Sequence, residues 1–177
     1  MENRGLAASA AAALMLWAGA ASAEMNPHFE ALKPFLGRTW RGTFQNSTPE
    51  KPMVDVSRFE LALSGQAVRN RHSVNDGEYA GESFIVWDEP KQSLVYYYFT
   101  TAGFYTTGTM RVEDGVLVSR EVVTGGTDGI TEVKGTMGVR PDGRMHVKTQ
   151  YLKGGGWVDG RDMDYVEDPQ AVVRLKE

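Results

Sequence analysis

The chain has no cysteine, only three histidines and no stripe of basic residues. Without cysteine it can form no disulfide, no thiolate metal site and no thiol nucleophile. Three scattered histidines argue against a zinc site, and the acidic segment 159–168 lacks the spacing of a calcium-binding EF-hand loop. The formal net charge is −4 with both signs interspersed, which argues against nucleic acid as a partner. We therefore expect no metal, and a chemistry that depends on ordinary polar side chains.

Long hydrophobic runs are equally scarce, since the chain has one, at residues 6–20. Arg4 precedes the run and the small residues Ala-Ser-Ala at 21–23 follow it, which is the pattern of a secretory signal peptide and its cleavage site. The alternative is an uncleaved anchor, but the run is alanine-rich and short for a membrane span of about 20 residues. We expect a signal peptide at 1–23, a single domain at 24–177, and a periplasmic or secreted protein without a stable membrane anchor.

The rest of the chain is rich in β-branched and aromatic residues, in short segments separated by turn-forming pairs such as Asp76-Gly77 and Asp114-Gly115. No connection is long enough for a crossover helix, so successive strands are expected to pair as an antiparallel meander. An open sheet of that size would leave exposed edges, and closure into a barrel removes them. The ten predicted strands are 38–45, 53–63, 66–75, 78–87, 93–100, 104–113, 116–124, 130–140, 144–153 and 157–166.

A short helix is expected before the first strand, because apolar residues recur at helical spacing in 28–36. Pro34 limits its length and Gly37 ends it. The sequence thus predicts an all-β protein, a closed antiparallel up-and-down barrel of about ten strands with a short amino-terminal helix.

The inward faces of the strands follow from turn lengths, because a tight turn fixes which residues stand opposite each other. This rule places His72 opposite both Ser57 and Gly81, and Tyr96 opposite Gly108. It also pairs Glu60 with Arg69 on the outer face, as expected of a solvated surface.

The loops before the last strands are longer, so the faces there are less firmly fixed. We expect Thr131 to point inward. If residues 154–156 form the last turn, Asp159, Arg161 and Tyr165 also point inward.

The inward set mixes apolar and polar side chains, and each buried polar group needs a partner. A cavity that holds ligand or water meets that need more easily than a packed core. The predicted ligand-binding residues are His72, Asn70, Ser83, Tyr96, Tyr98, Glu121, Tyr151, Arg161 and Tyr165.

Two interpretations stay open for each ionisable member of this set. His72 is either a haem or metal ligand or a general base, or a core histidine bonded to Ser57 or Asn70. Glu121 is either a general acid or base, or the structural partner of Tyr96. Arg161 either binds a ligand carboxylate or forms an ion pair with Glu121 or Asp159.

Residues 35–42 read Phe-Leu-Gly-Arg-Thr-Trp-Arg-Gly. A short helix, a glycine and a first-strand tryptophan before an antiparallel meander resemble the calycin group, which comprises lipocalins, fatty-acid-binding proteins and nitrobindin-like barrels. Ten strands favour the last two shapes, and secreted bacterial proteins of this lipocalin-like type are the most similar in plan. The resemblance implies that Trp40 packs across the closed end of the barrel, and that Arg161 and Tyr165 bind a ligand carboxylate.

The same resemblance bears on cofactors. Nitrobindin-like barrels bind haem through a histidine on a late strand, whereas the last histidine here, His146, is expected on the outer face. We therefore expect no haem and no other cofactor.

Two functions are compatible with these features. The first, which we favour, is a secreted protein that binds a small, partly apolar ligand with an anionic end in the barrel cavity. The alternative is a barrel enzyme in which Glu121, His72 and Tyr98 transfer protons.

The outer face of the central strands is also unusually apolar. It indicates either a homodimer interface or a surface covered by the amino-terminal segment. Its residues are Phe84, Val95, Tyr97, Phe99 and Tyr105.

Overall fold

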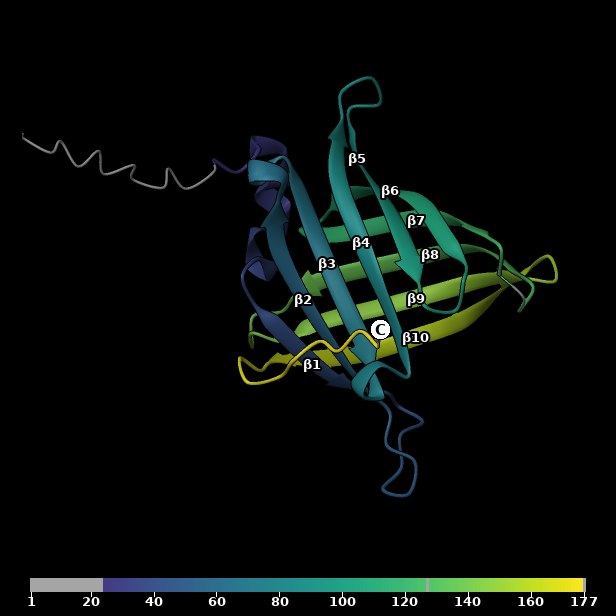
Figure 1. The fold of residues 1–177 in the computed structure, drawn as a ribbon. Helices are drawn as coiled ribbons and strands as arrows, with labels where there is room; N and C mark the ends of the chain where they lie inside the picture. Colours follow the sequence, from purple (N-terminus) through teal and green to yellow (C-terminus); the bar gives the residue numbers. More distant parts are fainter. Residues whose placement is uncertain (1–23, 127, 177) are drawn as a thin grey trace, which may run out of the picture.

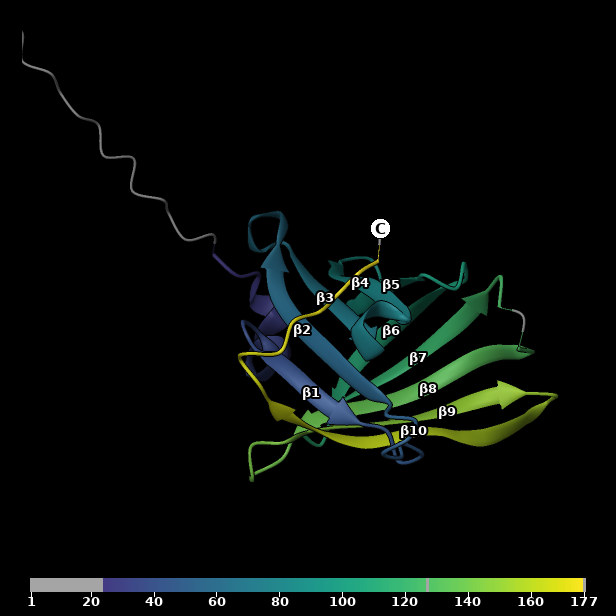
Figure 2. The same cartoon turned by 60° about the horizontal axis from the view of Figure 1, so that its bottom comes forward.

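The computed structural model describes residues 24–126 and 128–176, so the predicted signal peptide at 1–23 lies outside the described residues. The described chain forms ten antiparallel strands closed into one barrel, as the sequence predicts (Figures 1 and 2). Each strand pairs with its neighbours in sequence, and the first pairs with the last. The strands are β1 (Thr39–Thr43), β2 (Val54–Ala62), β3 (Ala67–Val74), β4 (Tyr79–Asp88), β5 (Ser93–Thr100), β6 (Tyr105–Glu113), β7 (Val116–Thr124), β8 (Ile130–Val139), β9 (Met145–Lys153) and β10 (Gly156–Glu167).

The turn between β6 and β7 shows why the chain reverses where it does. Asp114 and Gly115 both adopt positive φ angles, 49° and 78°. That conformation suits aspartate followed by glycine, and its twist matches the twist of the flanking strands. Glu113 and Val116 consequently stand opposite each other and start the β6–β7 ladder.

The predicted register of the first hairpins is confirmed. His72 lies opposite Ser57 on one side and Gly81 on the other. Tyr96 lies opposite Gly108. The register therefore shows which face of these strands points into the barrel. The side chains on that face form the wall of the site.

A bulge at the start of β8 corrects one prediction. The register shifts between Ile130 and Glu132, so that Thr131 is an extra residue in the strand. Its side chain lies on the exposed surface and donates a hydrogen bond to the Leu152 carbonyl. Thr131 is therefore outside the barrel, because a bulge reverses the alternation of faces before it.

The last hairpin contains two irregularities that offset each other. Lys153 pairs with Gly156, so the turn is one residue shorter than predicted, and Asp159 points outward, where it accepts a hydrogen bond from Gln150 (3.1 Å). A second bulge between Asp159 and Asp162 then adds a residue back. Arg161 and Tyr165 point inward as predicted, whereas the prediction for Asp159 is wrong.

One end of the barrel is closed by η1 (Pro27–Phe35), a 3-10 helix at the purple end of the ribbon in Figure 1. The Asn26 side chain caps its start by accepting a hydrogen bond from the backbone N–H of His28 (3.0 Å). Phe29, Leu32 and Trp40 are completely buried in one cluster there, which removes water from this end.

No helix of the described chain is long and apolar enough to cross a membrane.

Candidate functional site

A cavity of about 690 Å³ occupies the barrel interior. Sites for small molecules run from roughly 300 to 1,000 Å³, so the cavity has the size of a ligand site. Its wall includes every residue that the sequence predicted for binding; their role in binding stays a prediction. Those residues are His72, Asn70, Ser83, Tyr96, Tyr98, Glu121, Tyr151, Arg161 and Tyr165.

Asp55 and Tyr79 are also polar residues of the wall, and the sequence analysis identified neither of them as inward. Each lies two residues from an inward position that the sequence did identify, Ser57 on β2 and Gly81 on β4. Continuing the alternation one step further along each strand would have found both.

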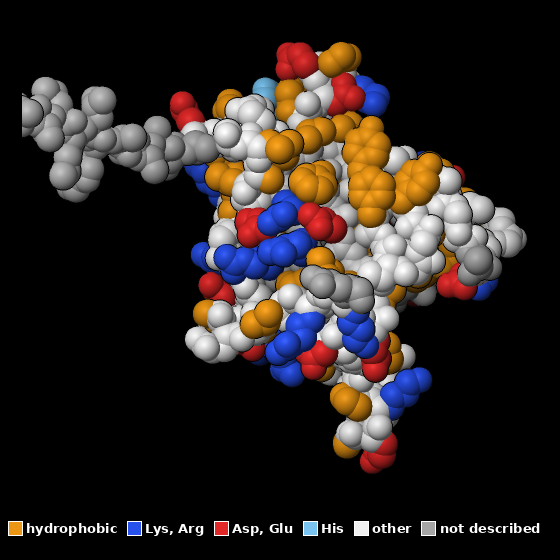
Figure 3. All heavy atoms as spheres, viewed as in Figure 1, with side chains coloured by type: hydrophobic (Ala, Val, Ile, Leu, Met, Phe, Trp, Pro, Cys, Tyr) orange, Lys and Arg blue, Asp and Glu red, His pale blue; other side chains and the backbone are white. Residues whose placement is uncertain are grey.

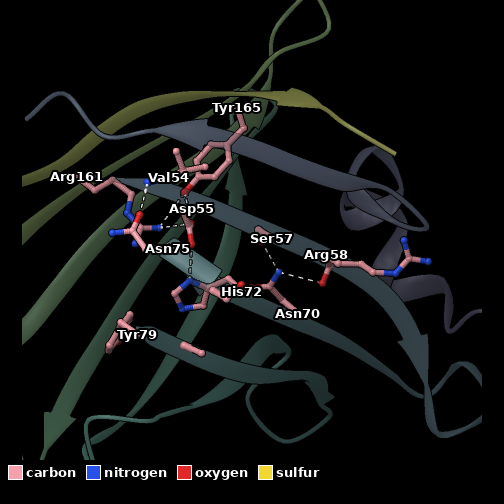
Figure 4. Close-up of polar contacts among 12 residues, drawn as sticks. Val54, Asp55, Ser57, Arg58, Asn70, His72, Asn75, Tyr79, Arg161 and Tyr165 are labelled. Carbon is pink, nitrogen blue, oxygen red and sulfur yellow. Dashed lines mark hydrogen bonds and ion pairs between the residues drawn. The ribbon is translucent and has the colours of Figure 1, made fainter. Parts of the chain in front are cut away.

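Asp55 is the centre of a hydrogen-bond network that joins β2, β3 and β10 (Figure 4). Its side chain is 1% exposed. One carboxylate oxygen accepts a hydrogen bond from Nδ1 of His72 (2.8 Å), and the other accepts one from the Tyr165 hydroxyl (2.6 Å). Nη1 of Arg161 donates to the Tyr165 hydroxyl (3.1 Å) and lies 3.5 Å from Asp55 Oδ2. The carboxylate thus has polar partners on both oxygens.

The network continues from His72 into the cavity wall. Nε2 of His72 lies 2.7 Å from the Tyr98 hydroxyl, which lies 2.6 Å from the Tyr79 hydroxyl. Asp55 accepts a hydrogen bond from Nδ1–H of His72. When Nε2 carries no proton it is an acceptor, and the two tyrosines can then donate in turn along the chain. His72 is therefore not bonded to Ser57 or Asn70, as one interpretation of the sequence had it; Asn70 donates instead to the Ser57 hydroxyl (2.7 Å).

The charges within this network stabilise one another. Burial by itself would raise the pKa of Asp55, but the hydrogen bond and charge of His72 and the charge of Arg161 bring the pKa below its usual range. Burial would lower the pKa of Arg161, but Tyr165 and Asp55 raise it, so the guanidinium stays protonated. Burial raises the pKa of Tyr98, which stays a neutral phenol and a hydrogen-bond donor.

A second polar group surrounds Glu121 on β7. The Thr106 hydroxyl donates to Oε2 of Glu121, and the Tyr96 hydroxyl hydrogen-bonds to the same carboxyl group. Burial raises the pKa of Glu121, against the opposing effect of the Thr106 and Tyr96 hydroxyls. Within the described chain no hydrogen bond joins Glu121 to His72 or Tyr98. Glu121 therefore lies in a different hydrogen-bonded group from His72 and Tyr98, the residues with which the sequence predicted that it would transfer protons.

Glycines on the neighbouring strands make room for these inward rings. A Cβ at Gly81 would lie 2.2 Å from Cε2 of Tyr98, and one at Gly108 would lie 2.8 Å from Cε1 of Tyr96. Any larger residue would displace the ring. The two glycines therefore fix where the hydroxyls of the site lie.

The raised pKa of Glu121 gives a testable pH dependence. The pKa of Glu121 is higher in the folded protein than in the unfolded chain. At pH values between these two pKa values the folded protein binds more protons, so the free energy of unfolding falls as the pH rises through this range. Glu121→Gln removes this loss, so we expect the variant to gain stability relative to the wild type as the pH is raised from about 4 to about 8. Thermal unfolding of both proteins across this range measures it.

Glu132→Gln is the matched control, because Glu132 pairs with Arg120 (2.6 Å) on the outer face of the adjacent strand. We expect that surface change to stay within about 1 kcal/mol at each pH. An advantage of Glu121→Gln that does not grow with pH would contradict the prediction.

Hydrophobic side chains gather on the outer face over β5 and β6 (Figure 3), and three of the five predicted residues are exposed there. Tyr97, Phe99 and Tyr105 are 48%, 51% and 40% exposed and lie together on β5 and β6. Val95 points outward but is only 8% exposed, so it does not belong to the exposed face. Phe84 is partly buried. The homodimer itself stays a prediction.

No cluster of three or more metal-ligating side chains suited to a metal ion occurs within residues 24–126 and 128–176. His146 lies on the outer face, where its Nδ1 is hydrogen-bonded to Oδ1 of Asp164 (2.7 Å).

Comparisons with known proteins identify the fold and no more. No family model matches the chain, and no curated protein matches it. Among solved structures, the crystal structure of Rv2717c from M. tuberculosis is similar with a TM-score of 0.59 and 16% sequence identity. The match covers 82% of this chain and 99% of that one. It supports the closed barrel and leaves the calycin resemblance unconfirmed.

Proposed function

We propose that this barrel is an exported, calycin-like binding protein that holds a small, partly apolar molecule with an anionic end. The observation that carries the proposal is the cavity of about 690 Å³ with the cationic side chain of Arg161 in its wall. Export rests on the pattern at 1–23, and the family on residues 35–42 and the number of strands.

The apolar part of the ligand would lie against the hydrophobic part of the wall. Removing apolar surface from water contributes about 25 cal/mol per Å². The residues available for this contact include Phe59, Ile85, Phe104, Met110 and Leu117.

The anionic end would lie at Arg161. A guanidinium has five N–H donors in a planar fork, and the Tyr165 hydroxyl accepts from Nη1. Asp55 faces the same nitrogen at 3.5 Å, and both of its oxygens accept closer hydrogen bonds from His72 and Tyr165. Further donors of Arg161 are therefore available to an anion, with the Tyr151 hydroxyl on the same wall.

Arg161→Met tests this assignment. One charge-assisted hydrogen bond contributes roughly 1.5–3 kcal/mol, so the variant should bind decanoic acid about 10- to 100-fold more weakly. The methyl ester of the same acid should bind both proteins about equally. Displacement of a fluorescent fatty acid measures both ligands.

Arg140→Met is the control, since Arg140 lies on the outer face with Asp164 (3.0 Å) and should leave binding unchanged. An equal loss for acid and ester in Arg161→Met would refute the anion assignment.

A proton-transfer enzyme is the second candidate, and the chain Asp55–His72–Tyr98 favours it. A carboxylate that orients an imidazole, which in turn contacts a phenol, is an arrangement suited to general acid–base catalysis. Native mass spectrometry of the purified protein separates the two functions, because a ligand that co-purifies supports the carrier.

A further inference from the structure

We propose that Glu121, with Thr106, Ser119 and Tyr96, forms a second polar subsite of the cavity, which binds a hydroxyl or amino group at the far end of the ligand. These four residues form the Glu121 subsite. The inference rests on the proposed function and narrows its ligand to a molecule with an anionic end and a hydrogen-bond-donating end.

The two polar groups lie on separated strands of the wall. Glu121 is on β7 and Arg161 is on β10, with β8 and β9 between them. Three strand spacings of about 4.8 Å correspond to roughly 14 Å along the sheet. Between the two groups, Val133 on β8 stands opposite Glu121, and Tyr151 on β9 stands opposite Val133. The Thr149 hydroxyl, also on β9, accepts a hydrogen bond from the backbone N–H of Arg161 (2.7 Å). A ligand that reaches from one group to the other would cross a strip of mixed apolar and hydroxyl-bearing side chains.

The two carboxylates of the cavity wall differ in how their charge is balanced. Asp55 has a guanidinium at 3.5 Å and an imidazole at 2.8 Å. Glu121 has no ion pair with any described residue, and its partners are hydroxyl groups. A carboxylate away from water needs a counter-charge or donors to offset its lost hydration. Glu121 is the one of the two that a ligand would complete.

The hydroxyl groups beside Glu121 direct their protons into the protein wall. Thr106 and Tyr96 hydrogen-bond to Glu121, and Ser119 donates to the Gly135 carbonyl, 3.5 Å away. Glu121 itself is only partly buried, and the surface it keeps is on the cavity wall. The subsite therefore presents acceptor oxygens to the cavity, and the chemistry that fits it is a donor: a hydroxyl or an amine.

Three acids of equal chain length test the subsite: decanoic acid, ω-hydroxydecanoic acid and ω-aminodecanoic acid. We expect the wild type to bind at least one of the two substituted acids about tenfold more tightly than decanoic acid, the equivalent of about 1.4 kcal/mol. In Glu121→Leu that preference should disappear, while decanoic acid binds at least as tightly as before. Isothermal titration calorimetry on the full set gives the affinities.

The outcomes are distinguishable. A larger gain for the amine, lost in Glu121→Gln, assigns a cationic end; a gain for the hydroxyl that survives in Glu121→Gln assigns a neutral donor, because the amide oxygen still accepts. Glu121→Gln also serves if Glu121→Leu does not fold. If decanoic acid binds the wild type as tightly as both substituted acids, this inference is wrong while the proposed function stands. If no acid binds, both are wrong.

Discussion

Replacing Asp55 by alanine is expected to lower the free energy of unfolding by about 3–5 kcal/mol, the usual result of removing one partner from a buried ion pair. Asp55 is buried, and its loss would leave His72 without its acceptor and Arg161 without its counter-charge. For a domain of this size the melting temperature should fall by about 6–20 °C. The loss should shrink in acid, because the lowered pKa of Asp55 means that its contribution disappears as pH falls through the folded pKa.

Asp164→Ala is a closely matched control. Asp164 also contacts a histidine and an arginine, His146 at 2.7 Å and Arg140 at 3.0 Å, but on the outer surface. Surface ion pairs contribute roughly 0–1 kcal/mol, so this variant should unfold almost as the wild type does. Equal destabilisation by the two changes, measured by denaturant unfolding, would show that burial of the network adds nothing.

Trp40→Ala should also cost about 3–5 kcal/mol, as truncations of buried aromatic residues do. The Trp40 ring is fully buried in the cluster that closes the η1 end, with Phe29 and Leu32. Its Nε1 is buried without a hydrogen-bond partner among the described residues, so Trp40→Phe removes an unsatisfied donor and should cost much less than the alanine variant.

The comparison for Trp40 is Trp157→Ala. Trp157 is partly exposed and contacts Lys134, whose ammonium lies 3.8 Å from the ring centre. An exposed cation–π contact contributes about 0.5–1 kcal/mol, so this loss should be small. Circular dichroism follows unfolding without depending on tryptophan fluorescence. If Trp40→Ala and Trp157→Ala lose the same stability, the closed end is not a packing centre.

Where turns are tight, the sequence was sufficient to predict which side chains enter the barrel. The turn at Asp76-Gly77 determines that His72 on β3 pairs with Gly81 on β4. The turn at Asp114-Gly115 determines the pairing of β6 with β7 in the same way. The cavity wall could be predicted for that reason, since facing is a local property that pairing carries from one strand to the next.

The contacts within the wall could not be predicted in the same way. The hydrogen bond between Tyr165 and Asp55 joins residues 110 positions apart, and it exists because β1 closes the barrel between β2 and β10. Closure places Tyr165 opposite Gly42, which stands opposite Asp55. Knowing which side chains of each strand point inward does not tell which strands meet when the barrel closes. Bulges such as the one at Thr131 are also invisible to turn counting, because the extra residue lies within a strand.

The short turn and the bulge of the last hairpin bear on how this protein tolerates insertions and deletions. Loss of one glycine from the turn would allow Lys153 to pair with Trp157 instead of Gly156, and the bulge would then no longer be needed. Pairing from Asp162 onward would stay as it is, and Arg161 would keep its place in the wall. The bulge can therefore absorb the loss of one residue from the tip of this hairpin, and the Arg161 side chain still faces the cavity.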